Sequence, residues 1–204
     1  MIVSTAEPGK NINLTGTTYL LRKLRIFGVV TALAAYPFIL ASIALSPWFN
    51  FYNNALSDLG NTVSNGQVGY VYNVGLVVAG VLIISFAVVL SREAPDRRVL
   101  IWTVPLVISS LDLAMVGVFS ENAGRIHGVV SEIFFLMIVV TMLAYSYVSW
   151  PLGSPRIGAV ALSFGIFSAL IWYLSWPWSG IAIQESATSG MTAIWLILVA
   201  SKLK

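Results

Sequence analysis

Charge, histidine and cysteine are scarce in this sequence of 204 residues. Only 9% of the residues are charged, one is histidine and none is cysteine. The lack of cysteine excludes disulfides, thiolate metal sites and a cysteine nucleophile, and one histidine excludes a zinc site with three histidine ligands. With 58% hydrophobic residues and a mean hydropathy of +0.87, the composition is far from the soluble balance of about half apolar and a quarter charged. We therefore predict an integral membrane protein.

Six apolar stretches are each long enough to cross a bilayer, which takes about 20 residues with a lower bound near 17. They cover residues 26–46, 68–90, 99–119, 128–150, 157–177 and 187–203. The predicted fold class is all-α, a polytopic membrane protein with six transmembrane helices. One six-helix transmembrane domain, residues 26–204, follows a cytoplasmic N-terminal tail, residues 1–25. The first stretch is predicted to be retained, because no small-x-small cleavage site follows it.

The basic residues predict the orientation of these spans. Every Lys and Arg except Arg125 precedes the first span, lies in the second or fourth connection, or is one of the last three residues of the sequence. By the positive-inside rule both termini are cytoplasmic, in a multi-pass protein of the cell membrane. The net charge of +3 reports this placement, so no nucleic-acid partner is predicted.

Polar residues able to do chemistry concentrate on the opposite, outer side. The first outer connection carries an amide and a carboxylate, the second holds the sole histidine among charged residues, and the third holds one carboxylate. One further carboxylate lies about two turns below the outer end of the third span, where it must face the bundle interior and find donors or a proton. We predict that these groups form one polar site: Asn54, Asp58, Asp112, Glu121, Arg125, His127, Ser131, Glu132 and Glu185.

Catalytic roles are assigned to three of these residues. His127 would act as a general base, with Asp58 or Glu121 fixing its tautomer. Arg125 would hold an anionic head group. The sequence identifies no cofactor and no metal ligand set, and it leaves open whether a reaction is catalysed.

Structural explanations stand beside each functional one. Asn54 and Asp58 equally fit a loop in which side chains bond local backbone amides. His127 equally fits a hydrogen bond to Glu121 or Asp58 that closes the top of the bundle. Arg125 equally fits a pair with Glu121.

The same alternatives apply to the carboxylates next to the last and third spans. Glu185 equally fits a cap on the amino end of the last helix, where the helix dipole favours a carboxylate. A protonated Asp112, bonded to a Ser or Tyr on a neighbouring helix, would serve stability alone.

Several motifs resemble a known membrane family. They are Asn54-Ala-Leu-Ser-Asp-Leu-Gly60, Tyr72-Asn-Val-Gly-Leu76 and Gly117-Val-Phe-Ser-Glu121, followed by His127 and Ser131 and by an acidic residue before the last helix. This pattern, over roughly residues 26–203, is similar to the six-helix family catalogued as domain of unknown function nine-nine-eight. Ser120 stands where that family usually has proline. The resemblance implies the fold and a shared outer polar cluster, and it implies no established reaction.

Three functions remain compatible with the sequence. The first is an extracytoplasmic-facing site that binds or hydrolyses a lipid or small amphiphile, with membrane lipid as the partner. The second is an accessory or structural subunit of a larger membrane complex, in which other membrane subunits contact the outer loops. The third is a proton- or ion-coupled carrier in which Asp112 titrates; it ranks last because no inverted repeat is evident.

Overall fold

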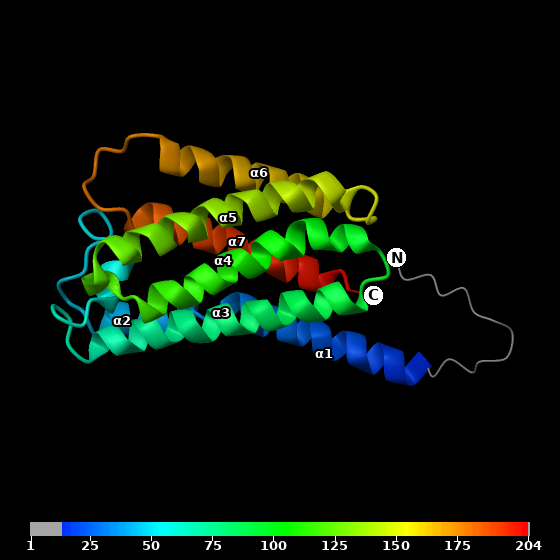
Figure 1. The fold of residues 1–204 in the computed structure, drawn as a ribbon, viewed down its shortest axis with the longest axis horizontal. Coiled ribbons are helices and arrows are strands. Elements are labelled where there is room, and N and C mark those ends of the chain that lie inside the picture. The colour runs from blue at the N-terminus through cyan, green and yellow to red at the C-terminus, as the bar shows by residue number, and fades with distance from the viewer. Residues whose placement is uncertain (1–13, 204) are drawn as a thin grey trace, which may run out of the picture.

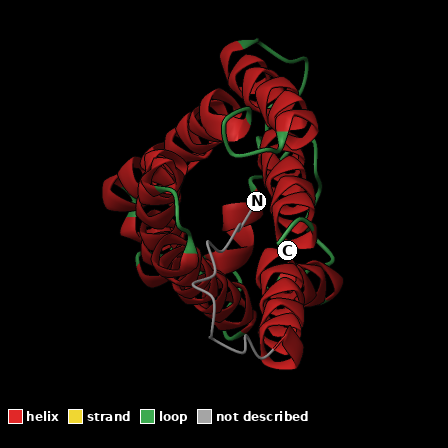
Figure 2. Cartoon of the chain, turned by 90° about the vertical axis from the view of Figure 1, so that its right-hand side faces the viewer, coloured by secondary structure: helices red, strands yellow, loops and turns green. Residues whose placement is uncertain are grey.

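The computed structural model describes residues 14–203, which form helices and loops with no strand among them (Figures 1 and 2). Three short 3₁₀ helices lie between the α-helices: η1 (Leu56–Gly60), η2 (Arg97–Val99) and η3 (Glu121–Ala123). The α-helices are α1 (Leu14–Leu33), α2 (Tyr36–Ala44), α3 (Val68–Glu93), α4 (Leu100–Val118), α5 (Arg125–Ser149), α6 (Pro155–Tyr173) and α7 (Ala182–Ser201). The prediction of an all-α fold is confirmed.

Within the described residues, five helical segments are long and apolar enough to cross a membrane. They are Leu21–Ala44, Val68–Glu93, Arg97–Val118, Arg125–Ser149 and Pro155–Tyr173. The predicted sixth span, residues 187–203, overlaps α7, which begins earlier, ends at Ser201 and carries polar residues such as Gln184 and Glu185 in its first turns. These two and seven other α7 side chains are buried in the bundle. The chain is therefore a multi-pass helical membrane protein.

The first predicted span is two helices rather than one. Helix α1 ends at Leu33 and α2 begins at Tyr36, with Pro37 in its first turn. Proline has no backbone N–H to bond the carbonyl one turn earlier, so a helix breaks just before it. Helix α1 also begins at Leu14, inside the stretch predicted as a tail; residues 1–13 of that tail lie outside the described part of the chain.

Two other boundaries differ from the predicted spans. Helix α6 ends at Tyr173 instead of residue 177, because Pro177 cannot donate a helical hydrogen bond to the Tyr173 carbonyl. Helix α5 begins earlier than predicted, at Arg125, directly after Gly124, whose φ of 59° is one that glycine adopts readily.

Consecutive helices from α3 to α6 pack as antiparallel neighbours, and α7 returns between α1 and α6 (Figure 1). Small residues at the helix contacts permit close approach. A side chain at Gly80 would collide with Ala114 of α4, and one at Gly158 would collide with Ser149 of α5. Both pairs of helices therefore approach more closely than larger side chains allow.

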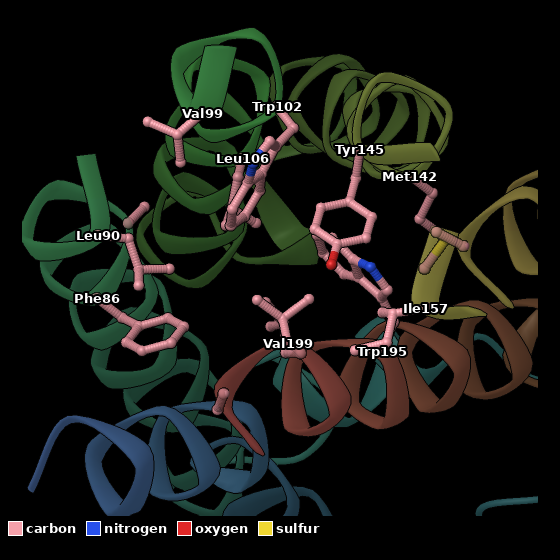
Figure 3. Packing of buried hydrophobic residues seen from close by; sticks show 14 of the residues in the cluster. Phe86, Leu90, Val99, Trp102, Leu106, Met142, Tyr145, Ile157, Trp195 and Val199 are labelled. Atoms are coloured by element: carbon pink, nitrogen blue, oxygen red, sulfur yellow. The ribbon is translucent and has the colours of Figure 1, made fainter. Parts of the chain in front are cut away.

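An aromatic cluster fills the core between these helices. Trp102, Tyr145 and Trp195 pack edge to face, with ring centroids 5.2 to 5.7 Å apart (Figure 3). The cluster ties α4, α5 and α7 together. Near the C-terminal end, the Arg25 Nε donates to the Leu203 carbonyl at 2.7 Å, so α1 and the chain end meet there. The three loops predicted to hold the site lie at the opposite end of the bundle (Figure 1).

Candidate functional site

The first and third outer loops are joined through their backbones. The Gly180 amide donates to the Tyr52 carbonyl at 2.8 Å, and the amides of Ile181 and Ala182 donate to the Asn54 carbonyl at 3.1 and 2.9 Å. Glycine is needed at 180, because a side chain there would collide with the backbone of Asn54. This junction places the start of α7 directly beside η1.

Side-chain amides join the first loop to the second. Asn61 Nδ2 donates to Glu121 Oε2 at 3.3 Å, and the Thr62 amide donates to Asn122 Oδ1 at 3.1 Å. Behind them, Asn73 of α3 donates to the Gly60 carbonyl at 2.9 Å. The 3₁₀ helix η1, which belongs to the first connection, therefore lies between the second connection and the start of α7 and contacts both.

Asp58 and Glu121 form a carboxyl pair at this centre. Asp58 Oδ2 accepts from Asn54 Nδ2 at 2.9 Å and from the Ala55 amide at 3.0 Å. The Asp58 carboxyl group also lies close enough to the Glu121 carboxyl group to affect its ionisation. Burial, and then this neighbour, raise the pKa of Glu121 to about 7. Asn54 and Asp58 thus bond the loop as the structural explanation expects, and Asp58 also affects Glu121.

Glu185 is the most deeply buried carboxyl group of the cluster, with 6% of its surface exposed. Its Oε2 accepts from the backbone amide of Leu56 in η1, so this side chain joins the third connection to the first. The alternative explanation was that Glu185 caps the amino end of its own helix, but the carboxyl group bonds the Leu56 amide of η1 and no side chain caps α7. Glu185 precedes the predicted span 187–203, and burial, followed by the charges of Asp58 and Glu121, raises its pKa to about 8.

The raised pKa of Glu185 predicts how the free energy of unfolding depends on pH. The folded protein holds this proton more tightly than the unfolded chain, where the pKa is near 4.5. As pH rises from about 4.5 to about 8, the unfolded chain loses the proton first, so the free energy of unfolding falls. Glu185→Gln keeps an acceptor for the Leu56 amide and cannot ionise. We expect it at least to halve the drop in melting temperature between about pH 5 and pH 9.

The measurement is thermal unfolding of the detergent-solubilised protein at a series of pH values. Glu93→Gln is the matched control, because Glu93 is exposed at the far end of α3. The control should melt with the pH dependence of the unchanged chain. A Glu185→Gln variant with that same pH dependence would contradict the assignment.

His127 is held by the end of the preceding helix. Its side chain is 7% exposed, and its Nδ1 lies 2.7 Å from the carbonyl oxygen of Phe119, which follows α4. A carbonyl oxygen only accepts, so Nδ1 carries the hydrogen and the neutral ring presents a bare Nε2. That Nε2 lies 3.4 Å from the Ser131 hydroxyl. The prediction that Asp58 or Glu121 orients this histidine is wrong, because the Phe119 carbonyl does so.

A cavity of about 740 Å³ opens between α5, α6 and the outer loops. Its outer end is polar and the rest of its wall is apolar. The polar lining consists of Ser57, Glu121, His127, Ser131, Glu132 and Glu185. The apolar lining includes Phe135, Leu136, Val139, Ala169, Trp172, Tyr173 and Ile181. Five of the nine predicted site residues therefore border one cavity, and Ser57 and the apolar wall were missed.

A smaller cavity of about 100 Å³ continues from this one into the bundle. Ser57, Ser131, Phe135 and Glu185 line both cavities. The smaller one is mostly apolar, with the buried Thr31 hydroxyl on its wall. Glu185 therefore stands where the two cavities meet.

Four predicted site residues do not line either cavity. Asn54 donates to the Asp58 carboxylate, and Asp58 lies beside the Glu121 carboxyl group. Asp112 is half-buried on α4 while its neighbours Leu113 and Ser110 are buried, so the interior position expected for it is not found. Arg125 is exposed and does not pair with Glu121; the one ion pair within residues 14–203 joins Arg98 to Asp96.

No group of three or more acidic or histidine side chains in the described part of the chain is arranged to hold a metal ion. The polar end of the cavity instead combines a carboxyl pair, a buried carboxyl group and a serine–histidine contact. Such a set can accept hydrogen bonds, hold protons and, at Ser131, bring a hydroxyl to a basic nitrogen.

Fold and site together define a multi-pass helical membrane protein with a polar cavity between its outer loops. The chain belongs to the family described as Protein of unknown function (DUF998), which matches residues 29–202. The resemblance seen in the sequence motifs is thereby confirmed. Neither the curated proteins nor the solved structures yield a match to this chain.

Proposed function

We propose that this protein binds a lipid or small amphiphile, with the head group at the polar end of the large cavity and the hydrocarbon chain along α5 and α6. One observation carries the proposal: a single cavity of about 740 Å³ joins a polar end to an apolar wall. Ligand sites typically enclose about 300–1,000 Å³, with mostly apolar walls and a few placed polar groups.

The cavity extends along α5 far enough for a hydrocarbon chain. His127 and Val139 both line it and are separated by about 18 Å along the helix, at a rise of about 1.5 Å per residue. Leu136 is 58% exposed and Tyr173 is 85% exposed. The cavity is therefore open to the side of the bundle, from which a membrane amphiphile would enter.

The proposed site faces away from the cytoplasm, in the cell membrane, with the N-terminus inside. The supporting feature is charge. Arg92 lies in the last turn of α3, Arg156 lies in the first turn of α6, and Arg25 of α1 bonds the Leu203 carbonyl beyond the end of α7. These positions are at the end opposite the outer loops, and basic residues favour the cytoplasmic side. Among the Lys and Arg residues that the structure describes, Arg125 alone lies at the end that holds the cavity.

Narrowing the cavity tests the proposal. Val139→Phe should weaken binding of a single-chain amphiphile with a brominated tail by about tenfold or more, because the added ring occupies the space of the chain. Binding is followed by quenching of tryptophan fluorescence, since Trp172 lines the cavity. Val140→Phe is the matched control, because Val140 is exposed on the next position of α5 and does not line the cavity.

Equal affinity for the brominated amphiphile in the two variants and the unchanged chain would refute the proposal. The accessory-subunit alternative then becomes the better account if His127→Ala and Asp58→Asn detach the protein from a copurifying membrane complex. The carrier alternative has less support, because Asp112 lines neither cavity.

A second candidate function is hydrolysis of the bound amphiphile. The observation that favours it is the Ser131 hydroxyl, 3.4 Å from a histidine nitrogen whose tautomer is set by the Phe119 carbonyl. A hydroxyl, a base and an orienting acceptor are the parts of an activated nucleophile, and their contacts are often long without substrate. The Ser131 Oγ would add to the carbonyl carbon of an acyl group while its proton passes to His127 Nε2 and the carbonyl π electrons move to oxygen. Collapse would break the bond to the leaving alcohol or amine, which takes the proton from His127, and water would then cleave the acyl-serine by the same steps.

A further inference from the structure

We infer that the amphiphile carries a cationic, amine-bearing head group. This inference rests on the proposed function, because it names the head that the same cavity takes. It excludes anionic lipids as the preferred ligand, contrary to the expectation that Arg125 holds an anionic head.

The cavity wall carries three carboxyl groups and one imidazole, that of His127. Glu121, Glu132 and Glu185 line it, and no Lys or Arg does so among the described residues. Asp58 adds a further carboxyl group directly behind Glu121. Arg125, the one Lys or Arg at this end within residues 14–203, is exposed and outside the wall. An anionic head would meet repulsion here, whereas a cationic head would be attracted.

The hydrogen-bonding groups of the polar end are mainly acceptors. Because His127 donates through Nδ1 to the Phe119 carbonyl, its Nε2 is left as an acceptor beside Ser131. The carboxylate oxygens accept as well, and the hydroxyls of Ser57 and Ser131 can do either. An ammonium group has donors and no acceptors, so it fits this set. A phosphate, which needs several fixed donors such as an Arg fork, does not.

Glu185 supplies an independent observation. It is more than nine-tenths buried, one of its oxygens accepts from the Leu56 amide, and it has no basic partner among the described residues. A buried carboxylate without a cation is strongly disfavoured. In the empty cavity a proton neutralises it, and a cationic head at the junction of the two cavities would replace that proton as its counter-charge.

Three amphiphiles with the same tail test the inference: dodecylamine, dodecanol and dodecyl phosphate. Each competes with the tail-brominated probe for the full chain in a neutral maltoside detergent, at submicellar added concentration. We expect dodecylamine to displace the probe at about a tenth of the concentration that dodecanol requires, or less, and dodecyl phosphate to be the weakest.

Variants separate the head group from the tail. Glu185→Gln and, independently, Glu132→Gln should reduce the preference for dodecylamine over dodecanol by several-fold. Glu132 is exposed at the cavity edge, so its variant tests the inference even where Glu185→Gln folds poorly. Glu93→Gln, at the other end of the bundle, should keep the full preference.

The outcomes are distinguishable. Equal displacement by the amine and the alcohol, abolished in Val139→Phe, would overturn the cationic head and leave the amphiphile site standing. Tighter binding of dodecyl phosphate would overturn it as well. Failure of all three to compete, or competition unaffected by Val139→Phe, would refute the proposed function itself.

Discussion

Replacement of Gly180 by valine is expected to lower the melting temperature by roughly 10 °C or more and to abolish amphiphile binding. The added side chain would meet the backbone of Asn53 and Asn54 closer than atoms pack, and a backbone cannot swing aside as a flexible side chain can. The two loops must therefore separate, which breaks the three backbone hydrogen bonds that join them.

The effect is large because these bonds hold the site together. Each lost hydrogen bond that leaves a buried group unpaired lowers stability by about 1–3 kcal/mol. Separation of the loops also moves Glu185 away from the Leu56 amide that it accepts from. The polar end of the cavity loses its shape along with the fold of the outer loops.

Gly190→Val provides the matched control for this experiment. Gly190 lies within α7, and no atom of the surrounding structure lies within 4 Å of an added Cβ. The control should melt within about 2 °C of the unchanged chain, because valine is no worse than glycine inside a helix. Thermal unfolding in detergent and probe quenching measure both quantities. Equal melting of the two variants would show that the loops tolerate separation.

The spans were predictable because the membrane fixes their length and composition. The residues at which the helices begin and end were less predictable. Pro37 and Pro177 each indicate a helix break. The predicted spans still ran through both prolines, because they were drawn from hydropathy and length alone. The early start of α7 at Ala182 depends on the hydrogen bonds from the third loop to Asn54. Contacts between loops far apart in the chain leave no mark in local composition.

The acids of the site were predictable because they are scarce and fall in the outer connections. The groups that the site residues contact were not predictable. His127 is oriented by the Phe119 carbonyl, and backbone carbonyls are the same at every residue. Asp112 shows a second limit: a helix turns about 100° per residue, and the sequence alone did not say which face of α4 is inward.

The apolar wall of the cavity was missed for a related reason. Phe135, Leu136 and Val139 continue the face of α5 that begins with His127 and Ser131, at helical spacing. In a soluble protein such a stripe would stand out against polar neighbours. In a spanning helix every side is apolar, so the stripe that lines a cavity looks like the stripes that face lipid or the core.

Labelling of Ser131 by a decyl fluorophosphonate is the sharpest test of hydrolysis. If His127 takes the hydroxyl proton, Ser131 Oγ should attack phosphorus and expel fluoride, and the protein mass should increase by one adduct. Ser131→Ala should give no adduct, and His127→Gln should slow labelling by about 10²-fold or more, the usual contribution of a general base. Intact-mass spectrometry follows both.

Ser57→Ala is the control that isolates the serine–histidine contact, because Ser57 lines the same cavity without contacting His127. It should label at the rate of the unchanged chain. An adduct on Ser57, or no adduct although the brominated probe still binds, would leave a cavity that holds an amphiphile without cleaving it. The catalytic assignment of His127 would then be abandoned, whereas the binding role of the cavity would stand on Val139 and Glu185.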